Sequence, residues 1–170
     1  MAQTTSPTTH ENPPHLDEPA AYNFNVDKEG RKYGILLGVL VAVYLLIVNA
    51  ITVELPLGLR FAKHLLIIPV VWYATKQYAV AIYSGNQVFK AEIGLLFRIG
   101  AWATIVLALG NILLSAISPN LGFEQFMNDN TSFGDAMMNS FFVAMETLVF
   151  VLIIGFVFMQ YYKRGGSPED

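Results

Sequence analysis

The feature that most constrains this chain is a set of long apolar stretches. The clearest is "YGILLGVLVAVYLLIVNAITV", from Tyr33 to Val53, which contains no charged side chain. About 20 apolar residues at a helical rise of 1.5 Å cross a hydrocarbon core of about 30 Å. The whole chain is 54% hydrophobic and 14% charged, whereas soluble domains hold about 25% charged residues. This pattern predicts an all-α membrane protein.

We expect four transmembrane helices, at about residues 33–53, 59–78, 93–117 and 138–161. The second is the least clean, because Arg60 and Lys63 lie at its start and Lys76 lies near its end. Long basic side chains can reach the interface from such positions, so a span still fits. Pro69 lies in the middle of this stretch and lacks the N–H of a helical ladder, which predicts a kink.

The predicted membrane domain, residues 31–164, lies between two polar segments. Residues 1–30 contain four of the eight prolines, with many Thr, Asn and acidic residues. Such a segment cannot bury enough apolar surface to offset its ordering entropy, so we expect a largely irregular N-terminal tail. It has neither the basic start nor the apolar core of a signal peptide. Residues 165–170 are expected to form a short C-terminal tail.

Lys and Arg are unevenly distributed between the two ends of the predicted spans. Eight of the ten fall on the side of the termini and of the loop between spans two and three: Lys28, Arg31, Lys32, Lys76, Lys90, Arg98, Lys163 and Arg164. The other side has only Arg60 and Lys63. Because segments rich in Lys and Arg stay in the cytoplasm, we expect both termini there.

Small residues recur at helical spacing on two of the spans. They are Gly34, Gly38 and Ala42 in the first span and Gly100, Thr104 and Ala108 in the third. Lipid tails are as apolar as Leu, so membrane helices associate through close packing at such faces and through polar contacts. We therefore expect these two stripes to pack against each other.

Polar side chains from all four spans are predicted at similar depth in the outer leaflet: Asn49, Lys63, His64, Asn111 and Glu146. One interpretation is an interhelical contact, in which Glu146 is paired, or is neutral, as burial tends to make it. The other is a proton or cation site, since ionisable residues inside membranes often mark pathways. After Glu146 the fourth span reads "TLVFVLIIGFVFM", without an ionisable group. This favours the structural interpretation.

Several classes of function find no support in the sequence. The chain has no cysteine, and no span carries the pair of histidines that ligates haem within membrane bundles. Metalloprotease, hydrolase and phosphate-binding motifs are also missing. A net charge of −3 gives no case for nucleic-acid binding. We predict neither enzymatic activity nor a cofactor or metal site.

The stretch "WYATKQYAVAIYSGNQVFKAEIGLLFRIGAWATIV" joins a basic and aromatic exit from span two to a short loop containing Gly, and then to the small residues of span three. Together with the early glycines of span one, this arrangement resembles a Bacteroidetes family of small four-helix integral membrane proteins, a domain of unknown function. The resemblance covers about residues 33–162, and the long N-terminal tail departs from it. It implies four spans and a bacterial inner membrane, and it implies no catalytic residues.

These observations predict a non-catalytic integral membrane subunit or scaffold, held in the lipid bilayer and packed against other membrane protein subunits in a larger complex. The alternative is a small oligomeric transporter or channel that uses the outer-leaflet polar cluster around Glu146. The third possibility is an enzyme that acts on lipid, but the sequence offers no convincing nucleophile or set of metal ligands for it. The expected location is the bacterial inner (cytoplasmic) membrane.

Overall fold

The computed structural model describes residues 24–51, 57–81, 88–117 and 132–164. Its elements are α1 (Val26–Ile51), α2 (Leu57–Ala62), the 3₁₀ helix η1 (Lys63–Leu66), α3 (Ile67–Ala81), α4 (Val88–Ile117) and α5 (Phe133–Arg164). No strand occurs within these ranges. The predicted all-helical fold is therefore confirmed. The remaining parts of the two predicted tails lie outside the described residues.

Two helices begin at side-chain caps that the local sequence supplies. The Oδ1 of Asn25 accepts hydrogen bonds from the backbone N–H groups of Asp27 and Lys28, both at 3.0 Å, so α1 begins at Val26. This start lies within the segment 1–30 that was expected to be tail. At α5, Ser132 and Asp135 form a reciprocal capping box, with each side chain accepting the other's backbone N–H.

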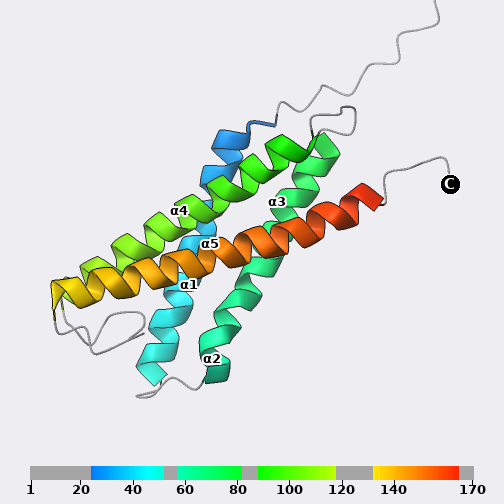
Figure 1. Ribbon diagram of the computed structural model, residues 1–170. Coiled ribbons are helices and arrows are strands. Elements are labelled where there is room, and N and C mark those ends of the chain that lie inside the picture. Colours follow the sequence, from blue (N-terminus) through cyan, green and yellow to red (C-terminus); the bar gives the residue numbers. More distant parts are fainter. Residues whose placement is uncertain (1–23, 52–56, 82–87, 118–131, 165–170) are drawn as a thin grey trace, which may run out of the picture.

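The helices form a bundle in which successive apolar segments run in alternating directions (Figure 1). The starts of α1 and α4 and the ends of α3 and α5 gather at one end, and the other helix ends lie toward the opposite end. The most extensive contacts are those of α4 with α1 and with α5, while α3 packs chiefly against α5 and more lightly against α1. Thus α4 lies between α1 and α5.

Among the described residues, three helices are long and apolar enough to cross a membrane. The qualifying stretches are Val26–Val48, Lys90–Ile117 and Phe133–Tyr162, in α1, α4 and α5. With 15 residues, α3 is too short to span by itself. These lengths and compositions indicate a multi-pass membrane protein.

The bundle interior is filled with aliphatic side chains that are almost completely removed from the surface. Leu37 and Leu45 of α1, Val71 of α3 and Leu95 and Leu107 of α4 are all fully buried. The outer faces are also apolar, with exposed Ile, Leu and Val on α1, exposed Ile, Leu and Phe on α4, and exposed Phe, Met and Val on α5. In water such contiguous exposed apolar surface would be exceptional, whereas a lipid environment accounts for it.

Glycines bring α1 and α4 close together. A Cβ atom built on Gly34 would lie 2.6 Å from Cβ of Trp102 and 2.7 Å from the backbone oxygen of Ile99. One built on Gly38 would lie 2.7 Å from Cβ of Val106. This stripe of α1, which continues to the half-buried Ala42, therefore packs against α4. Gly34 and Gly38, however, meet residues of α4 other than the predicted Gly100, Thr104 and Ala108.

The predicted counterpart stripe on α4 requires a correction. Gly100 faces α5, where its Cβ position would lie 2.4 Å from a methyl carbon of Leu148. The hydroxyl of Thr104 donates to the carbonyl of Ala101 in its own helix at 2.8 Å, and Ala108 is only half-buried. Because α4 lies between two neighbours, it has two packing faces, and Gly100 belongs to the face on α5.

Candidate functional site

A change of helix geometry at η1 positions two basic side chains. Pro69 has no N–H to donate to the carbonyl of residue 65, so an α-helical hydrogen bond is missing there. Just before it, residues Lys63–Leu66 adopt the tighter 3₁₀ geometry, and the N–H of Ile67 donates to the carbonyl of His64. The irregularity expected from Pro69 is thus a 3₁₀ turn. Both Lys63 and His64 are buried there, 1% and 7% exposed.

Lys63 of η1 forms an ion pair with Glu146 of α5. Its Nζ donates a hydrogen bond to Oε2 of Glu146 at 2.8 Å, and the side chain of Glu146 is 19% exposed. The side chains are 83 positions apart in the chain. Removing either charge from a site with so little solvent would leave the other uncompensated, which is strongly unfavourable.

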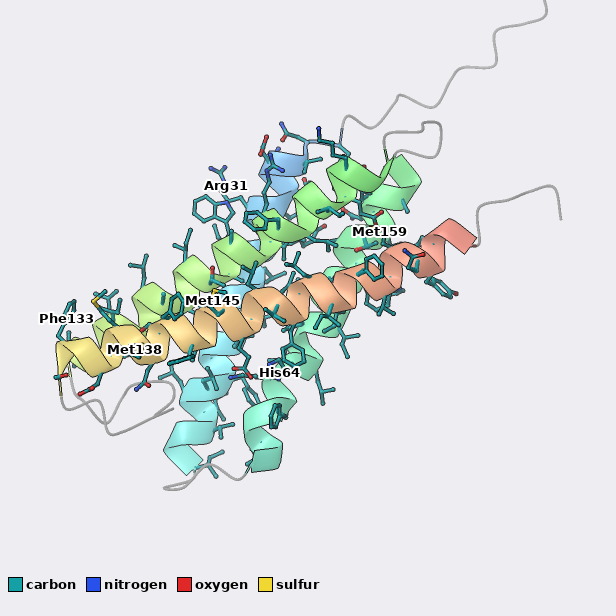
Figure 2. All side chains as sticks on the ribbon, viewed as in Figure 1. Arg31, His64, Phe133, Met138, Met145 and Met159 are labelled. Carbon is teal, nitrogen blue, oxygen red and sulfur yellow. The ribbon has the colours of Figure 1, made fainter. Side chains whose placement is uncertain are left out.

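His64 approaches the other oxygen of the same carboxylate. Its Nε2 lies 3.2 Å from Oε1 of Glu146, an ion-pair distance whose geometry falls short of an aligned hydrogen bond. Its Nδ1 lies 2.9 Å from the carbonyl oxygen of Phe61. The ring also stacks on Phe150, with centroids 3.7 Å apart. Figure 2 shows His64 beside α5. The imidazole is therefore held on both of its edges and one face.

The contacts of His64 restrict where its protons lie. A carbonyl oxygen is only an acceptor, so Nδ1 carries a hydrogen that it donates to Phe61. In the neutral ring, Nε2 then presents a lone pair toward Glu146. Only a protonated ring would also carry a hydrogen on Nε2 and direct it toward Oε1 of Glu146. Lys63, His64 and Glu146 thus form one polar cluster between η1 and α5.

The other predicted members of the polar cluster lie elsewhere or outside the described part. The Nδ2 of Asn111 donates to Oγ of Ser140 at 2.8 Å and contacts the carbonyl of Ala136 at 3.4 Å, so it joins α4 to α5. Asn49 lies in α1, and its side chain is outside the described structure.

Two buried acids near the opposite end of the bundle were missed in the sequence. Glu29 of α1 is 7% exposed and lies 3.5 Å from Nζ of Lys32, whereas Glu92 of α4 is 4% exposed. The Oε1 of Glu92 is buried without a hydrogen-bond partner among the residues that the structure describes. Helical periodicity could have identified it, because Glu92 shares a face with the buried Leu96 and Ile99.

Nothing in the four described ranges resembles a metal centre, because they contain no group of three His, Cys, Asp or Glu that could hold an ion. Comparisons with protein-family models, with curated proteins and with solved structures find no match to this chain. The resemblance to the Bacteroidetes family therefore stays a prediction. Function has to be argued from the geometry itself.

Proposed function

We propose that the chain is a four-span protein of the bacterial inner membrane that acts as a non-catalytic subunit or scaffold, packed against other membrane proteins. Beside α1, α4 and α5, the remaining span is the helical run from Leu57 to Ala81, in which α2, η1 and α3 follow one another without a gap. A run of this length covers a core of about 30 Å. Its outer face carries Leu65, Ile68 and Trp72, all exposed apolar side chains suited to lipid.

The orientation follows from the basic residues. Lys28, Arg31, Lys32 and Lys90 lie near the starts of α1 and α4, which gather at one end of the bundle. Toward the opposite end, Lys63 is buried and paired with Glu146. We assign the first end, with both termini, to the cytoplasm, because Lys and Arg near helix ends are retained there.

The observation that carries the scaffold role is the uneven coverage of the apolar helices. In the most apolar stretch of each long helix, the share of residues buried within the chain is 39% in α1, 33% in α4 and 22% in α5. The outer face of α5 includes Met138 and Met145, which are labelled in Figure 2 and about half exposed. Met side chains adapt to varied partner surfaces. We propose that this face of α5 receives a helix of another membrane protein.

Matched bulky substitutions test this role. Val149 of α5 and Val43 of α1 are similarly exposed, at 45% and 48%. On purification from native membranes in mild detergent, the unmodified chain should elute with membrane protein partners. Val149→Trp should release those partners, whereas Val43→Trp should retain them. A monodisperse monomer from the unmodified chain, with no copurifying protein, would argue directly against the proposal.

A second candidate function uses the cluster of Lys63, His64 and Glu146 as a proton site in an oligomeric transporter or channel. The favouring observation is the 3.2 Å approach of Nε2 of His64 to Oε1 of Glu146. A flux assay in liposomes distinguishes the two candidates. Glu146→Gln should abolish proton-coupled flux while the chain stays folded if the cluster is a transport site, whereas a purely structural contact predicts a less stable variant and no proton-coupled flux from the unmodified chain.

A further inference from the structure

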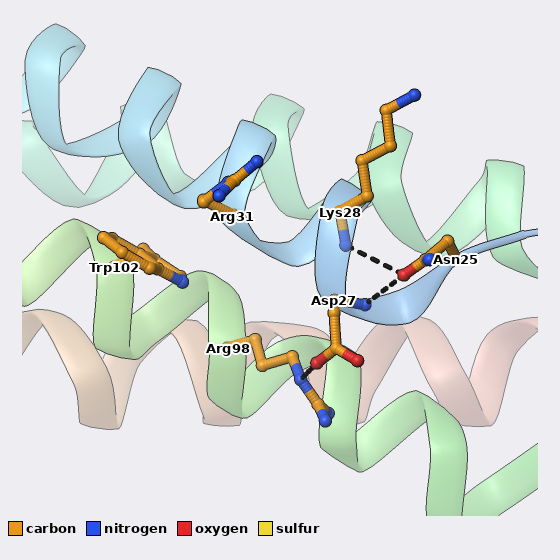
Figure 3. Close-up of a pocket in the computed structure, with 6 residues that line it drawn as sticks. All are labelled: Asn25, Asp27, Lys28, Arg31, Arg98 and Trp102. Carbon is orange, nitrogen blue, oxygen red and sulfur yellow. Dashed lines mark hydrogen bonds and ion pairs between the residues drawn. The ribbon is translucent and has the colours of Figure 1, made fainter.

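A cavity opens between the first turns of α1 and the first half of α4. Its volume is about 400 Å³. Figure 3 shows the lining residues, which are Asn25, Asp27, Lys28 and Arg31 from the beginning of α1 and Arg98 and Trp102 from α4. Three of these side chains are cationic and one is acidic. The cavity therefore has an excess of positive charge.

The close approach of the helices builds this cavity. A Cβ atom on Gly30 would lie 2.7 Å from Cβ of Arg98, and one on Gly34 would lie 2.6 Å from Cβ of Trp102. Because neither glycine has a side chain, Arg98 and Trp102 lie directly against α1. They consequently share one space with Arg31, which is a neighbour of both glycines in α1.

The charges in the cavity are only partly compensated. The carboxylate of Asp27 pairs with Nε of Arg98, whose Nη1 also donates to the carbonyl of Gly94 at 3.2 Å. These contacts hold the Arg98 side chain across the cavity wall. Within the described part of the chain, no acceptor pairs with the guanidinium of Arg31. The guanidinium of Arg31 is therefore available to bind an anion in the cavity.

Apolar surface continues from the cavity toward the middle of the bundle. On α1, Ile35 and Val39 follow Arg31 at spacings of four residues and are 39% and 46% exposed. On α4, Ile105 follows Trp102 and is 45% exposed. Residues three or four apart lie on one helix face. A cationic cavity thus leads into an exposed apolar strip.

We infer that this cavity binds the phosphodiester headgroup of an anionic membrane phospholipid, with an acyl chain along the strip of Ile35, Val39 and Ile105. Guanidinium groups bind phosphate oxygens in a bidentate manner, and Trp side chains favour the membrane interface. Basic pockets between membrane helices on the cytoplasmic side are suited to anionic headgroups. A soluble phosphate ester would use the cation but would leave the apolar strip without a role.

Tryptophan quenching by brominated lipids tests the site. The chain has two tryptophans, so Trp72→Phe leaves Trp102 as a reporter in the cavity wall. In vesicles of phosphatidylcholine, a small fraction of dibrominated phosphatidylglycerol should quench Trp102 more strongly than the same fraction of dibrominated phosphatidylcholine. In this background, Arg31→Gln and Lys28→Gln should each reduce that preference, by up to about fivefold.

Lys32→Gln is the matched control, because Lys32 is a neighbouring cation that does not line the cavity and lies near Glu29. It should leave the preference unchanged. Equal quenching by the two lipids, or an equal effect of Lys32→Gln, would overturn the inference. Competition by millimolar glycerol phosphate would also overturn it, by showing that a soluble phosphate ester suffices. The helical circular dichroism of each variant should match that of its parent.

Discussion

The Nζ of Lys63 lies 2.8 Å from Oε2 of Glu146, and this contact joins η1 to α5. Lys63 is the more deeply buried partner, with its side chain 1% exposed. This ion pair forms only while α5 stays in place beside η1. The pair therefore fixes the position of α5 relative to the irregular helical run that includes α2, η1 and α3.

Breaking this pair should destabilise the bundle more than removing it. Lys63→Met retains the length of the side chain but removes the lysine partner of Glu146, so we expect a loss of roughly 3 kcal/mol in the free energy of unfolding. The double variant Lys63→Met with Glu146→Met should recover most of this loss. Unfolding by SDS in mixed micelles, followed by circular dichroism, measures both. Equal stability of the single and double variants would show that the pair has no such role.

The contact between α1 and α4 depends on Gly34. In Gly34→Ala the new methyl group would meet the backbone oxygen of Ile99 at 2.7 Å, which no side-chain rotation relieves. We expect a destabilisation of about 1–3 kcal/mol. Gly58→Ala is the control, because its Cβ position has no atom within 4 Å and alanine favours a helix. Thermal unfolding in detergent should separate the two variants, and equal melting temperatures would argue against this close packing.

The proposed four-span topology would place Gly58 and Lys90 on opposite sides of the membrane. The chain has no cysteine, so single cysteines can be introduced without a background signal. Gly58→Cys should react with an impermeant maleimide added outside intact cells, whereas Lys90→Cys should react only after permeabilisation. Both positions are exposed in the structure. If the two cysteines react from the same side, the run from Leu57 to Ala81 does not cross the membrane.

Glu92 is expected to be a source of instability when it is ionised. Its Oε1 is buried without a hydrogen-bond partner in the described ranges, and an ionised carboxylate is costly there. Glu92→Gln removes the charge at nearly constant volume, so we expect the melting temperature at neutral pH to rise or to stay constant. Glu29→Gln serves for comparison, because that acid lies 3.5 Å from Lys32. A large fall in the Glu92→Gln melting temperature would point to an essential partner of this carboxylate.

The apolar segments could be predicted from the sequence because hydropathy alone determines which residues avoid water. The pairing of their faces could not. Gly100 has the spacing of a small-residue stripe, but that spacing does not reveal which neighbour the stripe meets, and Gly100 faces α5. The approach of Lys63 to Glu146 was one of several pairings that the sequence left open. Depth along a helix can be counted from the sequence, whereas rotation about the helix axis depends on packing.

The burial of Glu92 and the joint burial of Lys63 and His64 illustrate two different limits of prediction from the sequence. The burial of Glu92 could have been predicted from helical periodicity, because the buried Leu96 and Ile99 lie on the same helix face. The two neighbouring basic residues both turn inward at a local 3₁₀ turn. Adjacent side chains are separated by about 100° around the axis of an α-helix and by about 120° in a 3₁₀ helix, so helical spacing alone does not predict that both are buried. Pro69 signals an irregularity, but its direction depends on the neighbouring helix.

The most direct measurement of the proposed role is photo-crosslinking in native membranes, with benzoylphenylalanine placed at exposed phenylalanines. Phe141 and Phe156 of α5 are 57% and 50% exposed, and Phe97 of α4, at 54%, is the reference. We predict that the two α5 positions form adducts with the same membrane protein and that Phe97 does not. Adducts with lipid alone at Phe141 and Phe156 would contradict it.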